Sequence, residues 1–348
     1  MPTTAIVRDN RYLEHSAGPS HPESADRLRI IHDLVDTEFS AFPVITPRLA
    51  TEDELALIHD PFYIQRVAST AGRDRSQLDP DTGLSARSYE IACLAAGGLL
   101  NGIDALFNPQ PAAAHLQAVF AFVRPPGHHA EQDRAMGFCI FNNVAVAAAY
   151  AEERYGIKRI LIVDWDLHHG NGTQHAFYND RSVLFFSSHQ FPYYPGSGNF
   201  DEIGTGKGAG FTVNAPFPRG FGDAEYVHIY SSVLKPIALE YKPELILVSA
   251  GFDPYFKDPL GGMRVTGLGF GALASVVRDL AAASCPGKLL FTLEGGYNGE
   301  GLRNGVRAVL HALASGVPVR IAEPHMPEAE DIRQRMIAVH RHHWKSLI

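Results

Sequence analysis

Short apolar runs rich in β-branched residues alternate along this chain with longer segments whose apolar residues recur at helical spacing. This alternation predicts an α/β fold with a mostly parallel sheet covered by helices on both faces. The predicted strands are Ala5–Val7, Ala118–Val123, Ile160–Val163, Val183–Phe186, Phe211–Val213, Leu245–Ser249 and Leu289–Leu293. The predicted helices are Ser85–Phe107, Asn142–Tyr155, Asp223–Tyr241, Thr266–Ala283 and a C-terminal helix within Ile332–Ile348.

Length and composition are those of an ordinary globular protein. The chain has 348 residues, of which 45% are hydrophobic and 20% charged, and no linker, repeat or low-complexity tract divides it. Its net charge of −8 argues against a protein that binds nucleic acid directly through its overall field.

Cysteine usage bears on the compartment. Cys93, Cys139 and Cys285 form no C-x-x-C pair and fit small core residues in a reducing environment. The N-terminus lacks the pattern of a signal peptide, and no apolar run reaches membrane-spanning length. We therefore expect a cytoplasmic protein with no membrane contact.

The most informative motif is residues 164–170, Asp-Trp-Asp-Leu-His-His-Gly, directly after the predicted strand Ile160–Val163. Because side chains alternate along an extended chain, Asp164, Asp166 and His168 project to the same side. Charge at the end of a buried strand is costly unless it is hydrogen-bonded or coordinates a cation. Carboxylate and imidazole together suit a divalent metal such as zinc. The alternative is an acidic strand end that caps the next helix.

Three other predicted strands also end in residues typical of metal binding or acid–base chemistry. These ends are residues 124–131 with two histidines, residues 250–254 with an aspartate, and residues 294–298 with a tyrosine. Ligands of open parallel sheets bind outside the carboxyl ends of the strands. We therefore expect the four strand ends to face one pocket.

The residue types allow roles to be assigned. Asp166, His168 and Asp253 supply three zinc ligands and leave a position open for water and substrate, as a catalytic site requires. His128 and His129 cannot both be ligands if the site stays open, and imidazoles titrate near working pH, so they are better proton carriers.

Two further residues complete this arrangement. Asp164 is placed to accept the Nδ1–H of an imidazole and so to orient that ring. Tyr297, after the flexible Gly295-Gly296 pair, offers an uncharged donor to an oxyanion. Metal-activated water, an imidazole base and a phenol donor together indicate hydrolysis through a tetrahedral intermediate.

Two other sequence patterns, a glycine-rich stretch and a histidine cluster, are not predicted to form binding sites. The glycine-rich stretch Gly196–Gly210 includes Gly-Thr-Gly-Lys-Gly, but a strand rather than a helix follows it, so we expect a surface loop. His340, His342 and His343 lack carboxylate or thiolate companions and are expected to form a solvated tail.

These motifs resemble the histone deacetylase family, in particular its class II members and their bacterial relatives, within the arginase–deacetylase fold. In chain order they are residues 124–132 (RPPGHHAEQ), 137–142 (GFCIFN), 164–174 (DWDLHHGNGTQ), 249–253 (SAGFD), 258–262 (DPLGG) and 293–298 (LEGGYN), preceded by His21-Pro-Glu and Arg27. The resemblance implies one catalytic domain over residues 1–348, with a core at about 5–315, a helical tail at 316–348 and a mostly parallel sheet of eight strands.

The resemblance implies a zinc-dependent deacetylase with a defined set of catalytic residues. Zinc would be held by Asp166, His168 and Asp253. His129 would act as general base and then acid, His128 would be the second imidazole, and Tyr297 would polarise the acetyl carbonyl. Asn171, at a position that is Asp in class I enzymes, would pair with His129, while Asp164 would serve His128.

The resemblance also implies substrate contacts. Gly137 and Phe138 would line the tunnel for the acyl-lysine, and Tyr194, where the family usually has Phe, would form the opposite wall. Asp79 would be the rim residue that grips the substrate backbone, and Arg27 would line the pocket beneath the zinc.

Two structural potassium sites follow from the same resemblance. The nearer one would involve Asp164, Asp166, His168, Ser187 and Ser188. The outer one would involve Phe177, Asp180, Val183 and Phe211.

Three functions compete: a deacylase of lysine in proteins or peptides, a deacetylase of acetylpolyamines or other small acetylated amines, and a catalytically silent acetyl-lysine-binding or scaffold protein. The last is disfavoured because the ligands, both histidines and the tyrosine are present. Polyamine-specific relatives place Glu where this chain has Leu260, and Leu offers a distal ammonium no countercharge, which favours acyl-lysine. We also expect a homo-oligomer.

Overall fold

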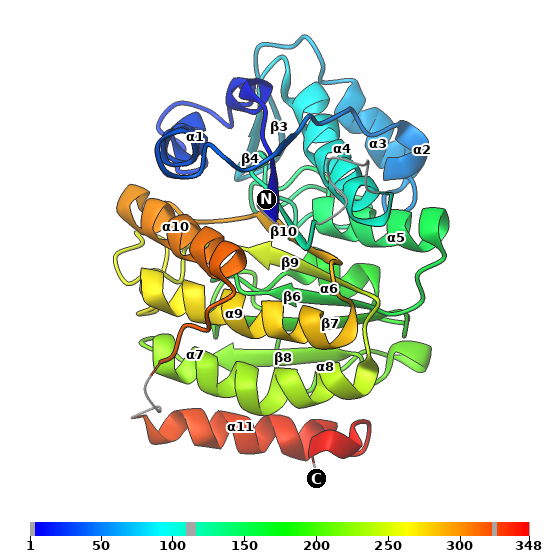
Figure 1. The fold of residues 1–348 in the computed structure, drawn as a ribbon. Helices are drawn as coiled ribbons and strands as arrows, with labels where there is room; N and C mark the ends of the chain where they lie inside the picture. Colours follow the sequence, from blue (N-terminus) through cyan, green and yellow to red (C-terminus); the bar gives the residue numbers. More distant parts are fainter. Residues whose placement is uncertain (1–3, 109–115, 322–325, 348) are drawn as a thin grey trace. The chain divides into compact units, whose positions relative to one another are not determined.

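The structure, a computed structural model, describes residues 4–108, 116–321 and 326–347. The chain forms two compact units, and each is built from separate stretches of sequence. The first unit is Met1–Ile157, Asn171–Ala176 and Leu290–Gly295; the second is Lys158–Gly170, Phe177–Leu289 and Gly296–Ile348. Figure 1 labels their elements in chain order.

The first unit contains four neighbouring strands in the order β2 (Val44–Ile45), β1 (Thr4–Val7), β5 (Ala118–Ala121) and β10 (Leu289–Leu293). β1 is parallel to both β2 and β5, and β1, β5 and β10 are fully buried. The helices of this unit are α1 (Ala25–Glu38), α2 (Glu52–Leu55), α3 (Pro61–Ala68), α4 (Ser88–Phe107), α5 (Asn143–Tyr155) and α6 (Asn171–Ala176). A separate antiparallel hairpin joins β3 (Ser76–Asp79) to β4 (Thr82–Leu84).

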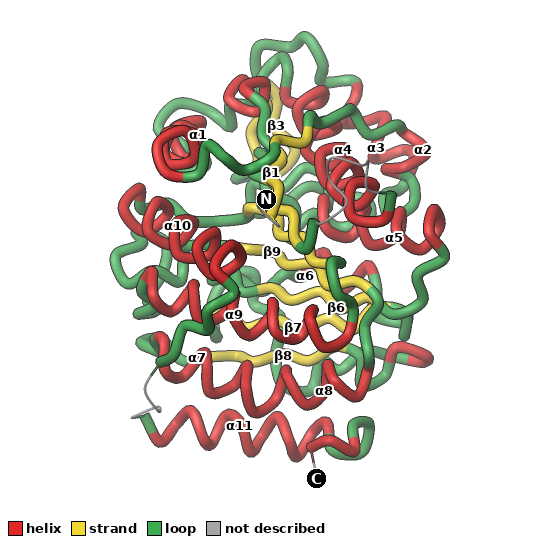
Figure 2. The backbone as a smooth tube through the Cα atoms, viewed as in Figure 1, coloured by secondary structure: helices red, strands yellow, loops and turns green. Residues whose placement is uncertain are grey.

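The second unit contains the neighbouring parallel strands β9 (Leu245–Ala250), β6 (Ile160–Asp164), β7 (Val183–Gln190) and β8 (Thr212–Phe217), drawn in yellow in Figure 2. Their residues are buried throughout, which explains the apolar runs at Ile160–Val163, at the start of β7 and in β9; the second half of β7 and part of β8 are buried but polar. The helices of this unit are α7 (Asp223–Ile229), α8 (Lys235–Tyr241), α9 (Gly267–Ser284), α10 (Gly299–Ser315) and α11 (Pro327–His340).

The predicted α/β fold with eight mostly parallel strands is confirmed, with four strands in each unit. All seven predicted strands are present, and each predicted helix is present at least in part. The sequence did not reveal the two-residue strand β2, the β3–β4 hairpin, or helices α1 to α3, α6 and α10, and α11 begins at Pro327 rather than Ile332. The two units interleave along the chain, and the assignment of residues 1–348 to one catalytic domain, with a tail at 316–348, stays a prediction.

Helix α4 corrects one expectation. It is the one helix in the described ranges that is long and apolar enough to cross a membrane by length and composition. Fourteen of its residues are buried, and it packs against α5 and β5. An all-round apolar helix of this kind is typical of a protein core as well as of a membrane span.

The helix predicted over Asp223–Tyr241 is interrupted. α7 and α8 are separated by a π-helical turn at Tyr230–Leu234. Pro236 lies at the start of α8, and because proline has no N–H to continue the i→i−4 ladder, the turn widens just before it. The prediction of one regular helix was therefore wrong at its centre.

His340 does not belong to a solvated tail. Its side chain is buried at the end of α11, and neither ring nitrogen has a hydrogen-bond partner, whereas His342 and His343 are exposed as expected. Burial lowers the pKa of His340 to about 4, because the charged form loses its hydration.

This shift predicts a loss of stability in mild acid. Above pH 6.5 His340 is neutral in both states, but as pH falls toward 4 the unfolded chain takes up the proton first. At pH 5 this single site is expected to cost about 2 kcal/mol of unfolding free energy. Urea denaturation at pH 7 and pH 5 should show a smaller loss for His340→Leu than for the wild type, and an equal loss in both proteins would contradict the assignment.

Candidate functional site

The three predicted metal ligands come from two adjacent strands of the second unit. β6 and β9 are parallel neighbours, with Asp164 opposite Ser249, so their carboxyl ends lie together. Asp166 and His168 follow β6, and Asp253 follows β9. The turn is held by a bond of 2.9 Å from the Leu167 N–H to Asp253 Oδ1.

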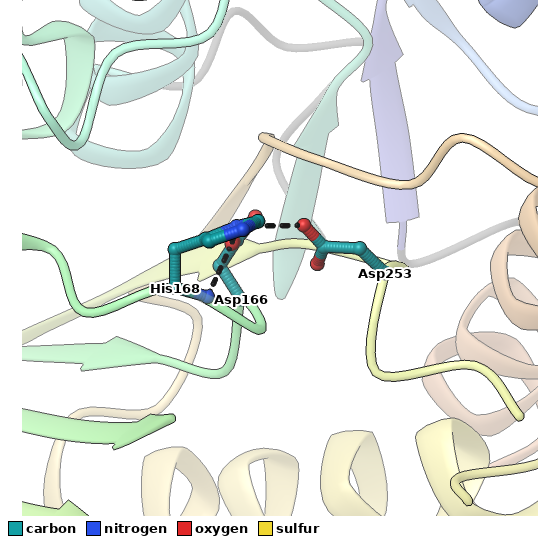
Figure 3. A group of neighbouring side chains, drawn as sticks. All are labelled: Asp166, His168 and Asp253. Carbon is teal, nitrogen blue, oxygen red and sulfur yellow. Dashed lines mark hydrogen bonds and ion pairs between the residues drawn. The ribbon is translucent and has the colours of Figure 1, made fainter. Parts of the chain in front are cut away.

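Figure 3 shows how these side chains converge. His168 Nδ1 lies 3.2 Å from Asp166 Oδ1 and 3.2 Å from Asp253 Oδ2. One ligand atom of each residue lies within 4.8 Å of the others. Both aspartates are buried, and the His168 side chain is nearly so. The prediction that these three residues come together is therefore confirmed.

The electrostatics of the cluster show an excess of negative charge. Burial raises the pKa of Asp253 to about 7, and Asp166 adds to the shift. Burial alone would lower the pKa of His168, but hydrogen bonds to Asp166 and Asp253 raise it to about 9. Two buried carboxylates around one imidazole thus hold a proton in the absence of any other cation.

The donor set fits a divalent metal ion. Asp253 Oδ2 is buried, and the group recorded beside it is His168 Nδ1 at 3.2 Å, so a metal ion bound here would take the place of the proton that the cluster holds. Two carboxylate oxygens and an imidazole nitrogen are ligands that zinc accepts, and three protein ligands leave a position open. At Gly251 an added Cβ would lie 2.1 Å from Asp166 Oδ2, so glycine is required for the close approach of the two strand ends.

Two tyrosines pack against the imidazole of this cluster. The ring of Tyr193 stacks on His168 with centroids 5.7 Å apart, and Tyr194 meets it edge-on at 6.0 Å. The resemblance implied Tyr194 alone as a wall of the substrate tunnel. Tyr193 was missed because the neighbouring aromatic residue fitted the family pattern.

The carboxylate of Asp258 connects two segments of the second unit. Its Oδ2 accepts the backbone N–H groups of Tyr297, at 2.7 Å, and Asn298, at 3.0 Å. Its Oδ1 accepts the N–H of Leu260 at 3.0 Å, and the Tyr193 hydroxyl donates to the Leu260 carbonyl. Asp258 was not among the predicted site residues, although it lies in the quoted motif 258–262.

The predicted potassium-site residues also lie in the second unit. Ser187 and Ser188 are buried in β7, where Ser188 Oγ bonds the Tyr230 hydroxyl at 2.9 Å. Asp164 Oδ1 accepts the Asp166 N–H at 3.0 Å. The outer set is Phe177, Asp180, Val183 and Phe211, which lie before β7, at its start and before β8. Both potassium sites stay predictions.

The two predicted proton carriers lie in the first unit, just after β5. His128 and His129 are both buried, with ring centroids 4.0 Å apart. The loop before them is fixed by Glu294 at the end of β10, because Glu294 Oε2 accepts the N–H groups of Gly127, at 2.7 Å, and His128, at 3.2 Å. Glu294 was not recognised from the sequence as an anchor of this loop.

His129 has the partner that the resemblance implied. Its Nδ1 lies 2.7 Å from Asn171 Oδ1, and Asn171 is the first residue of α6. An acceptor at Nδ1 favours the tautomer that carries its proton there and leaves Nε2 unprotonated, the form that acts as a base. The pairing of His129 with Asn171 is confirmed. That Asp164 orients the His128 imidazole stays a prediction.

The Gly137–Phe138 turn has a left-handed backbone and is bonded to the side chains of Asp81 and Thr82. Both residues have positive φ, +57° and +70°. The Gly137 N–H donates to Asp81 Oδ1 at 3.1 Å, and the Phe138 N–H donates to Thr82 Oγ1 at 3.2 Å. Asp79, the predicted rim residue, instead accepts the Asp81 N–H at 3.1 Å. Asp81, two positions along, is the carboxylate that contacts the turn.

Arg27 is buried within an ion network of the first unit. It donates to Glu23 Oε1 and to the Glu294 carbonyl, and Arg124 also bonds the Glu23 carboxylate. Burial would raise the pKa of Glu23, but Arg124 holds it well below its usual range. Arg27 thus bonds the segment that fixes the His128 loop, and its predicted contact with substrate stays a prediction.

Known proteins resemble this chain over nearly its whole length. A family model described as "Histone deacetylase domain" matches residues 21–313. A protein named "Probable deacetylase" from Archaeoglobus fulgidus is 36% identical, over 93% of this chain and 90% of that protein. The human protein named "Polyamine deacetylase HDAC10" is 38% identical, over 87% of this chain and 46% of its own length. The crystal structure of an HDA15 HD domain matches with a TM-score of 0.92 at 37% identity, covering 99% of this chain and 97% of that one.

Proposed function

Because the chain belongs to the histone deacetylase family and is a hydrolytic deacetylase with the arginase–deacetylase fold, we propose that it is a zinc enzyme that removes acyl groups from the ε-amine of lysine in proteins or peptides. The observation that carries the zinc assignment is the buried Asp166–His168–Asp253 cluster, in which one imidazole nitrogen faces two carboxylates. A zinc ion held by these residues would act as a Lewis acid toward the acyl carbonyl and make water a nucleophile near neutral pH.

The protein's own residues would carry the protons. His129, with its proton on Nδ1, accepts a proton from the attacking water at Nε2 as the water oxygen bonds to the acyl carbon. It then returns that proton to the leaving nitrogen as the C–N bond breaks. His128 serves as the second imidazole. The Tyr297 hydroxyl donates to the carbonyl oxygen as negative charge develops on it.

The proposed preference for acyl-lysine over acetylpolyamine depends on charge near Leu260. Leu260 is partly exposed and carries no countercharge for a distal ammonium, and the one carboxylate bonded to its backbone, Asp258, also accepts from Tyr297 and Asn298. Arg219 packs against Gly262, two residues further on. A second cation would therefore meet an apolar side chain at position 260, with the Arg219 side chain against Gly262.

The alternative substrate is a small acetylated amine, the class that the name of the human relative indicates for that protein. The test is a kcat/KM panel over acetyl-lysine peptides, longer acyl-lysine peptides and acetylated polyamines. We expect the peptides to be preferred. A higher kcat/KM for the polyamines would overturn the assignment of substrate while leaving the chemistry intact.

A charge placed at Leu260 should shift this preference. Leu260→Glu is expected to raise kcat/KM for an acetylated polyamine about fivefold, since an ion pair at a partly solvated rim contributes on the order of 1 kcal/mol. Leu260→Gln is the matched control, because it adds the same length and polarity without the charge. An equal gain in both variants would show that charge at this position does not select the substrate.

The two structural potassium sites, the cytoplasmic location and the homo-oligomeric state remain part of the proposal. Cys93, Cys139 and Cys285 are free and buried, which supports a reducing compartment.

A further inference from the structure

A chain of hydrogen bonds runs from His129 through Asn171 to Glu131, all within the first unit. Asn171 Oδ1 lies 2.7 Å from His129 Nδ1, and Asn171 Nδ2 donates to Glu131 Oε1 at 2.6 Å. On its other side, Glu131 lies 2.9 and 3.0 Å from His175 Nδ1 through its two oxygens. Glu131 is buried, while the His175 side chain is 48% exposed. The chain therefore links a buried imidazole to the surface.

The orientation of the Asn171 amide is fixed by its surroundings. Its Nδ2 side faces three acceptors: Glu131 Oε1, the His129 carbonyl at 3.3 Å and Met136 Sδ at 3.3 Å. A rotated amide would set its oxygen against the Glu131 carboxylate and present N–H groups to His129. Glu131 therefore keeps Oδ1 facing the imidazole.

Packing holds this arrangement in register. A Cβ on Gly172 would lie 2.2 Å from the Ala130 carbonyl oxygen, and the Thr173 N–H donates to the His128 carbonyl at 3.2 Å. A Cβ on Gly137 would lie 2.3 Å from Cδ2 of His129, so the ring has little room to turn. The start of α6 is thus fixed against the segment that carries both His129 and Glu131.

We propose that Glu131 is a positioning residue for His129, which acts through the amide of Asn171. A neutral amide oxygen is a weaker acceptor than a carboxylate, but a charge-assisted bond at its nitrogen polarises the amide and makes its oxygen more negative. An aspartate at position 171 would place a negative charge directly beside His129. Here the negative charge is that of Glu131, and it reaches His129 through the Asn171 amide. This inference rests on the proposed deacetylase function, because it assigns Glu131 to the support of the proton carrier.

The kinetic test compares three variants with the wild type. Glu131→Gln keeps an oxygen acceptor for Asn171 but removes the charge, and it is expected to lower kcat roughly 10–100-fold with KM and zinc content unchanged. Asn171→Asp alone places a second carboxylate against that of Glu131, and this variant should also have a lower kcat. The double variant E131Q/N171D restores one carboxylate beside His129 and should be more active than either single variant.

Asp133→Asn is the matched control. It removes the same charge two residues away, its side chain is 70% exposed, and kcat should stay within about twofold of the wild type. A wild-type kcat in Glu131→Gln would overturn the proposal, and so would a double variant no more active than the single ones. The comparison of Asn171→Asp with the double variant remains decisive if Glu131→Gln alone does not fold.

A spectroscopic test does not depend on turnover. In ¹⁵N-histidine spectra of the full chain, the Nδ1 proton of His129, assigned by its absence in His129→Ala, should be shifted downfield by its hydrogen bond. It should move upfield in Glu131→Gln and return in the double variant. An unchanged resonance would overturn the positioning role even if the enzyme is active. A wild-type protein with these shifts but no deacylase activity would overturn the proposed function instead.

Discussion

Removal of the metal is expected to abolish deacylation, and added zinc is expected to restore it. A zinc ion held by Asp166, His168 and Asp253 would supply the Lewis acid for the acyl carbonyl, and chelation would remove it. We expect kcat to fall at least about 10³-fold after chelation, with the protein still folded. Metal analysis and the activity assay on the same sample give the bound zinc and kcat together.

The same cluster sets the pH dependence of reconstitution. The pKa of His168 is raised to about 9 in the absence of metal, so below that pH zinc must displace a proton. Zinc affinity should therefore fall up to tenfold for each pH unit between 9 and 7, and more steeply below 7, where Asp253 also holds a proton. Asp253→Asn, which preserves shape but removes a ligand charge, should lose zinc, whereas the exposed Asp201→Asn should not. Full turnover by protein shown to be metal-free would reject the mechanism.

Replacement of His129 by alanine should give the second large effect. A positioned acid–base group contributes typically 10²–10⁴-fold, or about 3–5 kcal/mol of barrier, so kcat should fall by that factor. Zinc content should stay at the wild-type level, since the three ligands lie outside the segment that carries His129. Steady-state kinetics with metal analysis distinguish this result from loss of the metal.

His128→Ala is the matched comparison, because the two rings are adjacent and equally buried. His129 has the Asn171 acceptor at Nδ1, which leaves Nε2 available as a base, and it should therefore be the more sensitive position. If His128→Ala is the more damaging substitution, the two roles are reversed.

Strand ends were the part of the site that could be predicted from sequence alone. Asp166, His168 and Asp253 are each within a few residues of a buried apolar run, so the topology of a parallel sheet was sufficient to bring them together. The anchoring carboxylates were not predictable in this way. Glu294 accepts from Gly127, and Asp258 from Tyr297, across long separations in sequence, and such bonds leave no local pattern.

The same reasoning explains which parts of the fold were missed. Buried strands such as β6 and β9 have a continuous apolar sequence, whereas β2 has only two residues, which are not fully buried. In helix α1 the apolar residues Leu28, Ile31, Leu34 and Val35 recur at helical spacing among many charged residues, so a usable signal was present and the prediction left it out. The π-helical turn before Pro236 depends on where the backbone finds acceptors, which residue spacing does not specify.

The shared carboxylate of Asp258 has a consequence for engineering. Because one side chain bonds the backbone of both Leu260 and Tyr297, the position that would select the substrate and the phenol that would assist the reaction do not move independently. Laboratory evolution of new substrate scope at the Leu260 loop would therefore tend to sacrifice turnover. Libraries that leave Asp258 and its three backbone bonds intact are the ones in which scope can diverge while the rate is retained.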